Sequence, residues 1–411
     1  MVKKRKSWLV FIYVLLVLIC FYPYEFYSTY FLFIPNEATY FTAFLALVTG
    51  VLFLFNQRRF HSPITILVVF IQFVGFVLVT MAHRGGNITS PLIRMILALL
   101  LVFLIESSEG GLVGFFVKYN RWILLMAVLG TIALALQLFV GFRPLHPFVE
   151  RAGGLTMYNY GLTFTKSDLM YSGMIRYAGF FDEPGAMAYW GLYALLINKL
   201  YVKDNKLELI LSISLLFTFS LGYFFQLLVY LLLFSSGRNK KSTRLLLVVI
   251  SVFVVLAATR LSDESELYQR SIGRVTESLS TSQENEDVFM VDNRAGYAEN
   301  AKAVFMEYPW FGASATELED FGNNIYENLA TYGIIGCLFI LFPYLYIFII
   351  SIKYKEWDLL KCGIIVLLGF SHRPFHNALL YYFIMYSIIT MYYVNKKKID
   401  FSPVNNQKNI R

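Results

Sequence analysis

The chain has 411 residues, a formal net charge of +8, 57% hydrophobic residues and 15% charged residues. Soluble domains average about 45–50% apolar and about 25% charged residues. The 29 Tyr and 39 Phe residues are more aromatic side chains than a water-soluble protein could keep away from solvent. This composition excludes a soluble enzyme, a disordered protein and a nucleic-acid-binding protein. It indicates an all-α polytopic membrane protein, because apolar stretches of about 20 residues recur along the chain.

Apolar segments that could cross a membrane follow one another along the whole chain. About twelve transmembrane helices are predicted, over residues 8–24, 38–55, 63–82, 91–105, 121–142, 185–202, 207–220, 222–236, 245–259, 329–351, 361–373 and 377–394. Most Lys and Arg residues fall in alternate connecting segments, as expected for cytoplasmic loops. Both termini are therefore predicted to be cytoplasmic. The first span is predicted to be uncleaved, because no small-residue cleavage pattern follows it.

The pair 207–220 and 222–236 is the least regular part of this topology, because each segment is shorter than a full span. A single continuous helix would reverse the orientation of everything downstream and place an acidic segment inside, against the charge rule. Two tilted or half-inserted helices are therefore predicted.

Residues 1–411 are predicted to form one integral membrane domain with two long extracytoplasmic loops, 143–184 and 260–328. Loops of this length are usually functional or disordered. The second loop holds fourteen acidic residues against five basic ones. Within it, a short amphipathic helix is predicted over about 294–307, lying near the outer membrane surface. Its apolar face is formed by Tyr297, Ala301, Val304 and Phe305.

The chain contains no P-loop, HExxH or GxSxG pattern. Its three cysteines, Cys20, Cys337 and Cys362, fit neither a disulfide framework nor a zinc spacing. No metal and no cofactor are expected. Arginine is instead the conspicuous residue on the predicted outer side, at Arg84, Arg94, Arg143, Arg151, Arg176, Arg260, Arg270, Arg274, Arg294 and Arg373. Because the guanidinium fork fits phosphate oxygens, these residues favour a diphosphate ligand.

The sharpest local pattern runs from Arg176 to Gly185, at the entry to the sixth span. Glu183 and Pro184 place a carboxylate beside the start of a helix, where Pro suits the first turn and free N–H groups attract anions. The functional interpretation is a site formed by Arg176, Asp182 and Glu183. The alternative is an ordinary helix N-terminus in which Arg176 pairs with one of the two acids.

Two further patterns lie on the predicted outer side. Arg294 leads through the predicted amphipathic helix to Tyr308-Pro309-Trp310-Phe311-Gly312; the alternative is a surface turn with a solvated arginine. His372-Arg373-Pro374-Phe375-His376-Asn377 forms a tight turn between two apolar spans. Two histidines without a nearby acid are too few for a metal site, so a sugar or phosphate contact, or capping of the last helix, is expected there.

Taken together, these motifs resemble the Wzy-type polysaccharide polymerases and the related O-antigen ligases. The resemblance rests on Arg176 followed by Gly179-Phe180-Phe181-Asp182-Glu183-Pro184-Gly185, on the helix pair with Thr218-Phe219-Ser220 at its outer turn, on Asn293-Arg294 followed by Tyr308-Pro309-Trp310-Phe311-Gly312, and on Gly322-Asn323-Asn324-Ile325-Tyr326-Glu327-Asn328-Leu329 before Tyr332-Gly333. The chain departs from the family at Ser220-Leu221, where members often have Ser-Arg. It has Asn323-Asn324 where ligases carry His-Asn, which favours a polymerase.

The resemblance implies a GT-C-like fold and a metal-independent, inverting glycosyl transfer at the outer face of the bacterial cytoplasmic membrane. Donor and acceptor would be glycans on undecaprenyl pyrophosphate, in a lipid bilayer, with a chain-length regulator and a flippase as further partners and no nucleic acid. Arg176 and Arg294 would neutralise the pyrophosphate. Glu183 would act as the base, with Asp182 as the second choice. Substrate contacts are expected from Asp182, Arg84, Arg151, Asn324, Tyr326, Arg373 and His376.

Two alternative functions remain open at this point. One is a ligase of the same superfamily that transfers finished glycan to another acceptor. The other is a flippase or exporter of lipid-linked oligosaccharide that performs no chemistry. A transporter is expected to show internal repeats and charged residues inside its spans, whereas here the ionisable residues gather in the two outer loops.

Overall fold

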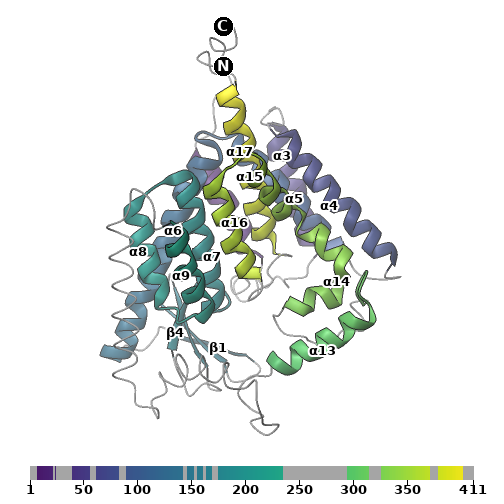
Figure 1. The fold of residues 1–411 in the computed structure, drawn as a ribbon. Helices are drawn as coiled ribbons and strands as arrows, with labels where there is room; N and C mark the ends of the chain where they lie inside the picture. Colours follow the sequence, from purple (N-terminus) through teal and green to yellow (C-terminus); the bar gives the residue numbers. More distant parts are fainter. Residues whose placement is uncertain are drawn as a thin grey trace. The chain divides into compact units, whose positions relative to one another are not determined.

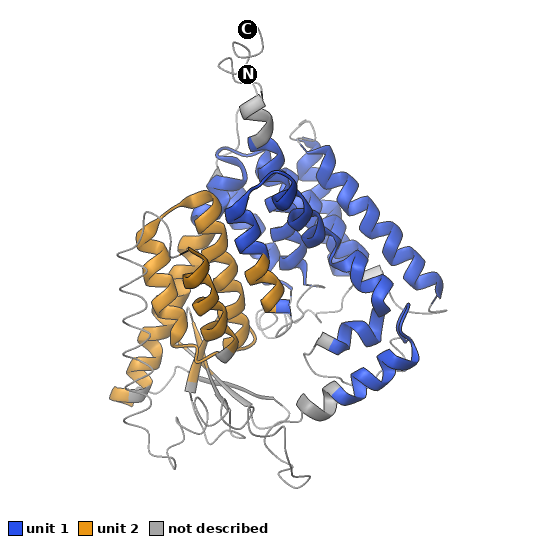
Figure 2. Ribbon diagram, in the orientation of Figure 1, with its two compact units in different colours: residues 1–118, 294–363, 370–411 blue, residues 119–293, 364–369 orange. Residues whose placement is uncertain are grey.

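The structure, a computed structural model, describes residues 7–21, 24, 39–55, 62–82, 89–141, 146–151, 155–160, 163–168, 175–234, 294–313, 325–370 and 378–400. These residues form helices and one small sheet (Figure 1). The chain divides into two compact units (Figure 2). Unit 1 comprises residues 1–118, 294–363 and 370–411, and unit 2 comprises residues 119–293 and 364–369. The first boundary falls inside a helix, so no linker in the sequence marks it.

Unit 1 is built around a helix that is apolar along most of its length. Its helices are α1 (Ser7–Ile19), α3 (Thr39–Phe55), α4 (Pro63–Ala82), α5 (Thr89–Glu106), the start of α6 (Gly111–Ala135), α13 (Arg294–Glu307), α14 (Ile325–Ile340), α15 (Phe342–Lys353), most of α16 (Trp357–Phe370) and α17 (Leu379–Asp400). Helix α5 packs against α3, α4 and α17. Its buried residues from Leu101 to Ile105 are almost fully shielded from solvent, as expected for a helix that is apolar on all sides.

The buried side chain of Gln72, in α4, contacts the junction between α14 and α15. Pro343 has no N–H to donate to the carbonyl of Phe339, four residues before it. The Gln72 side chain of α4 donates hydrogen bonds of 3.1 Å to the carbonyls of both Phe339 and Ile340. The hydroxyl of Tyr386 in α17 donates to Gln72 Oε1 at 2.5 Å. This polar chain satisfies backbone oxygens that the helix break would otherwise leave buried without partners.

Unit 2 surrounds a helix that is buried on every face. It contains the rest of α6, the π-helical turn η1 (Leu136–Val140), strands β1 (His146–Arg151), β2 (Leu155–Asn159), β3 (Phe164–Asp168) and β4 (Ile175–Gly179), helix α7 (Pro184–Ile197), the π-helical turn η3 (Asn198–Val202), α8 (Asn205–Leu216) and α9 (Leu221–Phe234). All 14 residues of α7 are buried. Small residues permit this close packing: a Cβ on Gly191 would lie 2.6 Å from Leu215 of α8.

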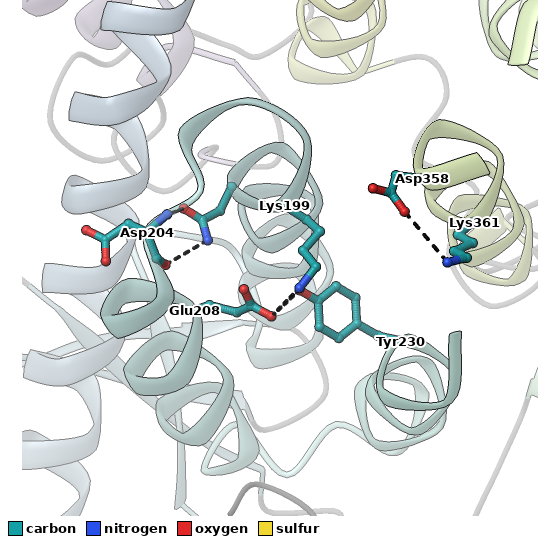
Figure 3. Close-up of polar contacts among 7 residues, drawn as sticks. Lys199, Asp204, Glu208, Tyr230, Asp358 and Lys361 are labelled. Atoms are coloured by element: carbon teal, nitrogen blue, oxygen red, sulfur yellow. Dashed lines mark hydrogen bonds and ion pairs between the residues drawn. The ribbon is translucent and has the colours of Figure 1, made fainter. Parts of the chain in front are cut away.

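Helices α8 and α9 form an antiparallel pair, which confirms the prediction of two helices rather than one. The hydroxyl of Tyr223 donates to the carbonyl of Ser212 at 3.1 Å. Further from the turn, the hydroxyl of Tyr230 donates to Glu208 Oε1 at 2.7 Å (Figure 3). Lys199 also contacts Glu208 Oε1, at 3.2 Å. This cluster joins η3, α8 and α9 beyond the C-terminal end of α7. Lys199 is 16 residues, roughly 24 Å of helix, from Glu183, so we interpret the cluster as structural.

The helices agree closely with the predicted apolar segments, apart from residues 245–259, which lie outside the described residues. Among the described residues, three helical segments are long and apolar enough to cross a membrane: Pro63–Ala82, Gly111–Ala135 and Tyr326–Lys353. Shorter apolar helices cover Trp8–Ile19, Tyr40–Phe55, Gly222–Phe234 and Leu379–Asn395. These findings agree with the predicted class of helical membrane protein.

Three details differ from the prediction. Helix α6 begins at Gly111 rather than near residue 121, so Lys118 and Arg121 lie within a helix and not in a loop. The segment 329–351 is not one helix, because Gly333 and the Leu341–Pro343 region interrupt it. The first long loop, expected to be irregular in an all-α protein, contains the antiparallel sheet β1-β2-β3-β4.

Candidate functional site

The candidate site in unit 2 lies where β4 turns into α7. In Figure 1, β4 lies at the lower end of the helices α7, α8 and α9. Phe181 N–H donates to the carbonyl of Ala178 at 3.0 Å, which closes a tight turn. Gly179 in this turn has φ +62°, a left-handed conformation that glycine adopts without strain. A Cβ at this position would also lie 2.8 Å from the sulfur of Met187.

The three residues predicted to take part in the chemistry, Arg176, Asp182 and Glu183, lie on either side of this turn. Arg176 lies in β4 and is half-buried. Asp182 is 8% exposed, and Glu183 is half-buried at the N-cap of α7. The Glu183 side chain makes no capping bond to α7, whereas its backbone carbonyl accepts from the N–H groups of Ala186 and Met187, both at 3.1 Å. The junction therefore combines a cation and two carboxylates at the start of a buried helix.

Aromatic packing holds the turn in place. The ring of Phe180 stacks on that of Trp122 in α6, with centroids 5.7 Å apart and planes 5° apart. The same ring meets Phe164 of β3 in a T-shaped contact at 5.9 Å. Such pairs contribute about 0.5–1.5 kcal/mol beyond the area they bury. Phe180, the first of the two residues between Gly179 and the acids, is thus fixed from two sides.

The residue after Arg176 inserts into the helices of unit 2. Tyr177 is fully buried, and its hydroxyl donates to the carbonyl of Ser214 in α8 at 2.5 Å. A Cβ on Gly130 of α6 would lie 2.3 Å from the Tyr177 ring. Burial raises the pKa of Tyr177 well above its ordinary value, so the phenol keeps its proton and remains a donor. Tyr177 therefore fixes β4 between α6 and α8.

The sheet register adds a second basic residue beside Arg176. Lys166 of β3 is the cross-strand partner of Arg176. Arg151, in β1 at the other edge, is separated from β4 by three interstrand steps, so its backbone is at least about 14 Å from that of Arg176. The sheet does not bring these two arginines together.

The other predicted part of the site belongs to unit 1. Helix α13 spans Arg294–Glu307, as predicted, and Arg294 is its first residue. Its apolar face does not point to a membrane surface: Ala301 is buried against Ala330 of α14, with Val304, Phe305 and Tyr326 packed around them. The face expected to contact lipid therefore contacts protein.

The chain after α13 docks onto a break in α14. Gly333 has φ +63° and ψ −176°, which interrupts the helix. The N–H groups of Ile334 and Ile335 donate to the carbonyls of Pro309 and Trp310, at 2.9 and 3.0 Å. On the other side of the break, the Ala313 N–H donates to the carbonyl of Ala330 at 2.7 Å. The backbone of residues 309–313 thus satisfies both new helix ends.

Two glycines permit this close approach. A Cβ on Gly333 would lie 2.4 Å from backbone atoms of Trp310 and Phe311, and one on Gly312 would lie 2.5 Å from the backbone of Thr331. Gly312 also has a positive φ of +80°. Both positions require glycine for reasons of space and of conformation.

The remaining predicted substrate contacts are placed only in part. Tyr326 is half-buried against the Ala301–Ala330 contact, so it supports the packing of α13 on α14. For Arg151 and Arg294 the structure describes the backbone. The last four residues lie outside the described residues: Arg84, Asn324, Arg373 and His376. The predicted convergence of Arg176 and Arg294 joins residues of different units and stays a prediction.

From the sequence, Tyr177 and Phe180 are among the loop aromatics that could stack on sugar rings, but their role in positioning β4, and the part played by Gly130 and Trp122, were not predicted. A signal for the sheet was present, because Gly153-Gly154 and Gly161 separate short runs rich in Thr, Tyr and Phe. The contacts to α6 and α8 have no sequence signal, because they join residues 37 or more positions apart.

Neither a scan against models of known protein families nor a search of curated proteins gave a match to this chain. Its function is therefore inferred from the residues and geometry of the two units.

Proposed function

We propose that the chain is a glycosyltransferase that polymerises lipid-linked oligosaccharide repeat units at the outer face of the bacterial cytoplasmic membrane. Its lipid carrier would be undecaprenyl pyrophosphate, its fold GT-C-like, and both termini cytoplasmic. The observation that carries the proposal is the β4–α7 junction. A half-buried guanidinium, Arg176, and two carboxylates, Asp182 and Glu183, lie within eight residues of one another at the start of the buried helix α7.

The chemistry requires charge stabilisation more than covalent catalysis. A hydroxyl of the acceptor sugar attacks the anomeric carbon of the donor, and the bond to the lipid pyrophosphate breaks with inversion. The departing pyrophosphate carries the bonding electrons, and Arg176 and Arg294 neutralise its charge. Removing a preorganised donor of this kind typically lowers the rate about 10²–10³-fold.

The proton of the acceptor hydroxyl passes to a carboxylate. Glu183 is the better base on structural grounds, because it is half-buried and reachable by a sugar hydroxyl, whereas Asp182 is only 8% exposed. We assign Asp182 to positioning of the junction. Because a pyrophosphate is already a good leaving group, modest assistance from the base suffices.

The helix break in α14 argues against the transporter alternative. Transporters use broken helices to present free N–H groups to anionic substrates. Here the N–H groups of Ile334 and Ile335, which begin the second half of α14, already donate to the carbonyls of Pro309 and Trp310. This break is occupied by the chain itself and serves to attach α13.

Reconstitution tests the proposal directly. Purified protein in vesicles, supplied only with lipid-linked single repeats, should produce a ladder of longer glycans. Arg176→Ala should remove the ladder, and Arg176→Lys should restore it only partly, because the planar fork is lost. Arg121→Ala, at an exposed position of α6 in the same unit, is the matched control and should retain the ladder. Products that form only when a different acceptor is added would indicate the ligase, and movement of the lipid without any ladder would indicate the transporter.

A further inference from the structure

A group of large apolar side chains is exposed at the end of α13. Met306 is 69% exposed, Trp310 63%, Tyr308 41% and Phe311 36%. We call these four residues the 306–311 patch. Soluble surfaces rarely leave adjacent large apolar side chains uncovered, and such a group indicates a binding surface.

The patch adjoins an apolar helical segment, interrupted at Gly333, that is long enough to cross a membrane. The segment Tyr326–Lys353 is one of the three that are long and apolar enough to do so. The carbonyl of Pro309 is bonded to the N–H of Ile334, and Ile334 and Leu338 are themselves 38% and 52% exposed. The two-glycine contact at Gly312 and Gly333 fixes the patch beside the first turns of this segment.

The composition of the patch identifies its partner. Trp and Tyr concentrate at the membrane–water interface, where the ring is apolar and the N–H or O–H reaches water. A patch made of Trp, Tyr, Phe and Met at the N-terminal end of a membrane-crossing segment matches this belt. The exposed residues of α13 between 299 and 303 are polar or small: Glu299, Asn300, Lys302 and Ala303.

We infer that the 306–311 patch inserts into the interfacial layer of the lipid bilayer, while the earlier turns of α13 remain in water. The helix is thereby held at one end, and its depth is set by the Gly312–Gly333 contact rather than by its own apolar face. This inference does not depend on the proposed glycosyl transfer.

The test compares the intact protein with Trp310→Phe in vesicles of phosphatidylethanolamine and phosphatidylglycerol. The difference between their fluorescence spectra is the signal of Trp310. We expect lipids brominated at a shallow acyl position to quench this signal strongly, lipids brominated near the acyl end to quench it less, and aqueous acrylamide to quench it weakly. Because Phe retains most of the ring and the side chain is largely exposed, the variant should fold.

A second variant measures the limit of the inserted region. Glu299→Trp in the Trp310→Phe protein places a tryptophan two turns, about 10 Å, before Met306 and on the same side of α13. This residue should be open to acrylamide and insensitive to brominated lipid. The inference is overturned if Trp310 is open to acrylamide and unaffected by bromine, if it is protected from both quenchers and hence covered by protein, or if residue 299 is quenched by bromine as strongly as Trp310.

Discussion

The hydroxyl of Tyr177 donates a hydrogen bond to the backbone carbonyl of Ser214, which ties strand β4 to helix α8. Tyr177 directly follows Arg176, so the same bond fixes the strand backbone from which the Arg176 side chain extends. The Tyr177 ring also lies over Gly130 of α6, where a Cβ would come within 2.3 Å. A tyrosine outside the chemistry thus positions the residue on which the proposed reaction depends.

Gly130→Ala should displace Tyr177 and with it Arg176. The added methyl group overlaps the ring, and overpacking of this kind costs about 1–3 kcal/mol. Tyr177→Phe should be milder, because the ring stays in place and one hydrogen bond worth about 1 kcal/mol is lost. Both variants should lower the turnover number more than they raise the KM for the acceptor, since they disturb a charge that acts in the transition state.

The control for these variants is Gly50→Ala in α3, whose Cβ would find its nearest neighbour at an ordinary 3.8 Å. It should unfold at the parent temperature or slightly above, because Ala is the better helix former. A Gly130→Ala protein with unchanged turnover would show that Tyr177 does not position Arg176.

Gly333→Ala should separate α13 from α14. Its methyl group would meet the backbone of Trp310 at 2.4 Å. The conformation of Gly333, φ +63° and ψ −176°, is one that essentially only glycine adopts, and it costs about 1–3 kcal/mol for a residue with a Cβ. Thermal unfolding of the purified protein measures the loss. Gly141→Ala is the comparison without a steric clash, because Gly141 (φ +65°, ψ 26°) lies in the left-handed helical region, which costs alanine less, and has nothing within 4 Å of the added atom. Equal losses in the two variants would show that the close contact of residues 309–313 with α14 contributes nothing.

Gln72→Leu should destabilise unit 1 although it adds an apolar side chain. It removes both donors to the carbonyls of Phe339 and Ile340 and leaves the Tyr386 hydroxyl without its acceptor. An orphaned buried polar group costs about 1–3 kcal/mol. Adding Tyr386→Phe should recover part of the loss, because the second change removes the orphaned hydroxyl, so the two effects should not add. Strictly additive losses in thermal unfolding would contradict a connected Gln72–Tyr386 network.

Helix positions were predictable because they follow from runs of apolar residues. Helix α4 has the predicted bounds 63–82, α13 has the predicted bounds 294–307, and the α8–α9 pair follows from the charge rule. The break at Gly333 was not predicted, because the same apolar residues continue on both sides of it. Only the contact with Trp310 shows why a glycine with a positive φ stands there.

The candidate site was predictable only in its local part. Arg176, Asp182 and Glu183 are close in the sequence, and Pro184 marks the start of α7, so their grouping could be inferred. The support from Tyr177, Gly130 and Phe180 could not, because it depends on how β4 packs between α6 and α8. The division into two units could not be predicted from the sequence either, because its first boundary falls inside the continuous helix α6.

We propose that Arg176 of unit 2 and Arg294 of unit 1 bind the same pyrophosphate. Cross-linking measures this most directly, in a protein whose native residues Cys20, Cys337 and Cys362 are replaced by Ala and which carries Arg176→Cys and Arg294→Cys. A bifunctional thiol reagent no longer than a diphosphate with its two arginine contacts should join the two positions within one chain. If both thiols react with a monofunctional reagent but the bifunctional one never joins them, the two arginines do not share a ligand and the proposed mechanism is wrong.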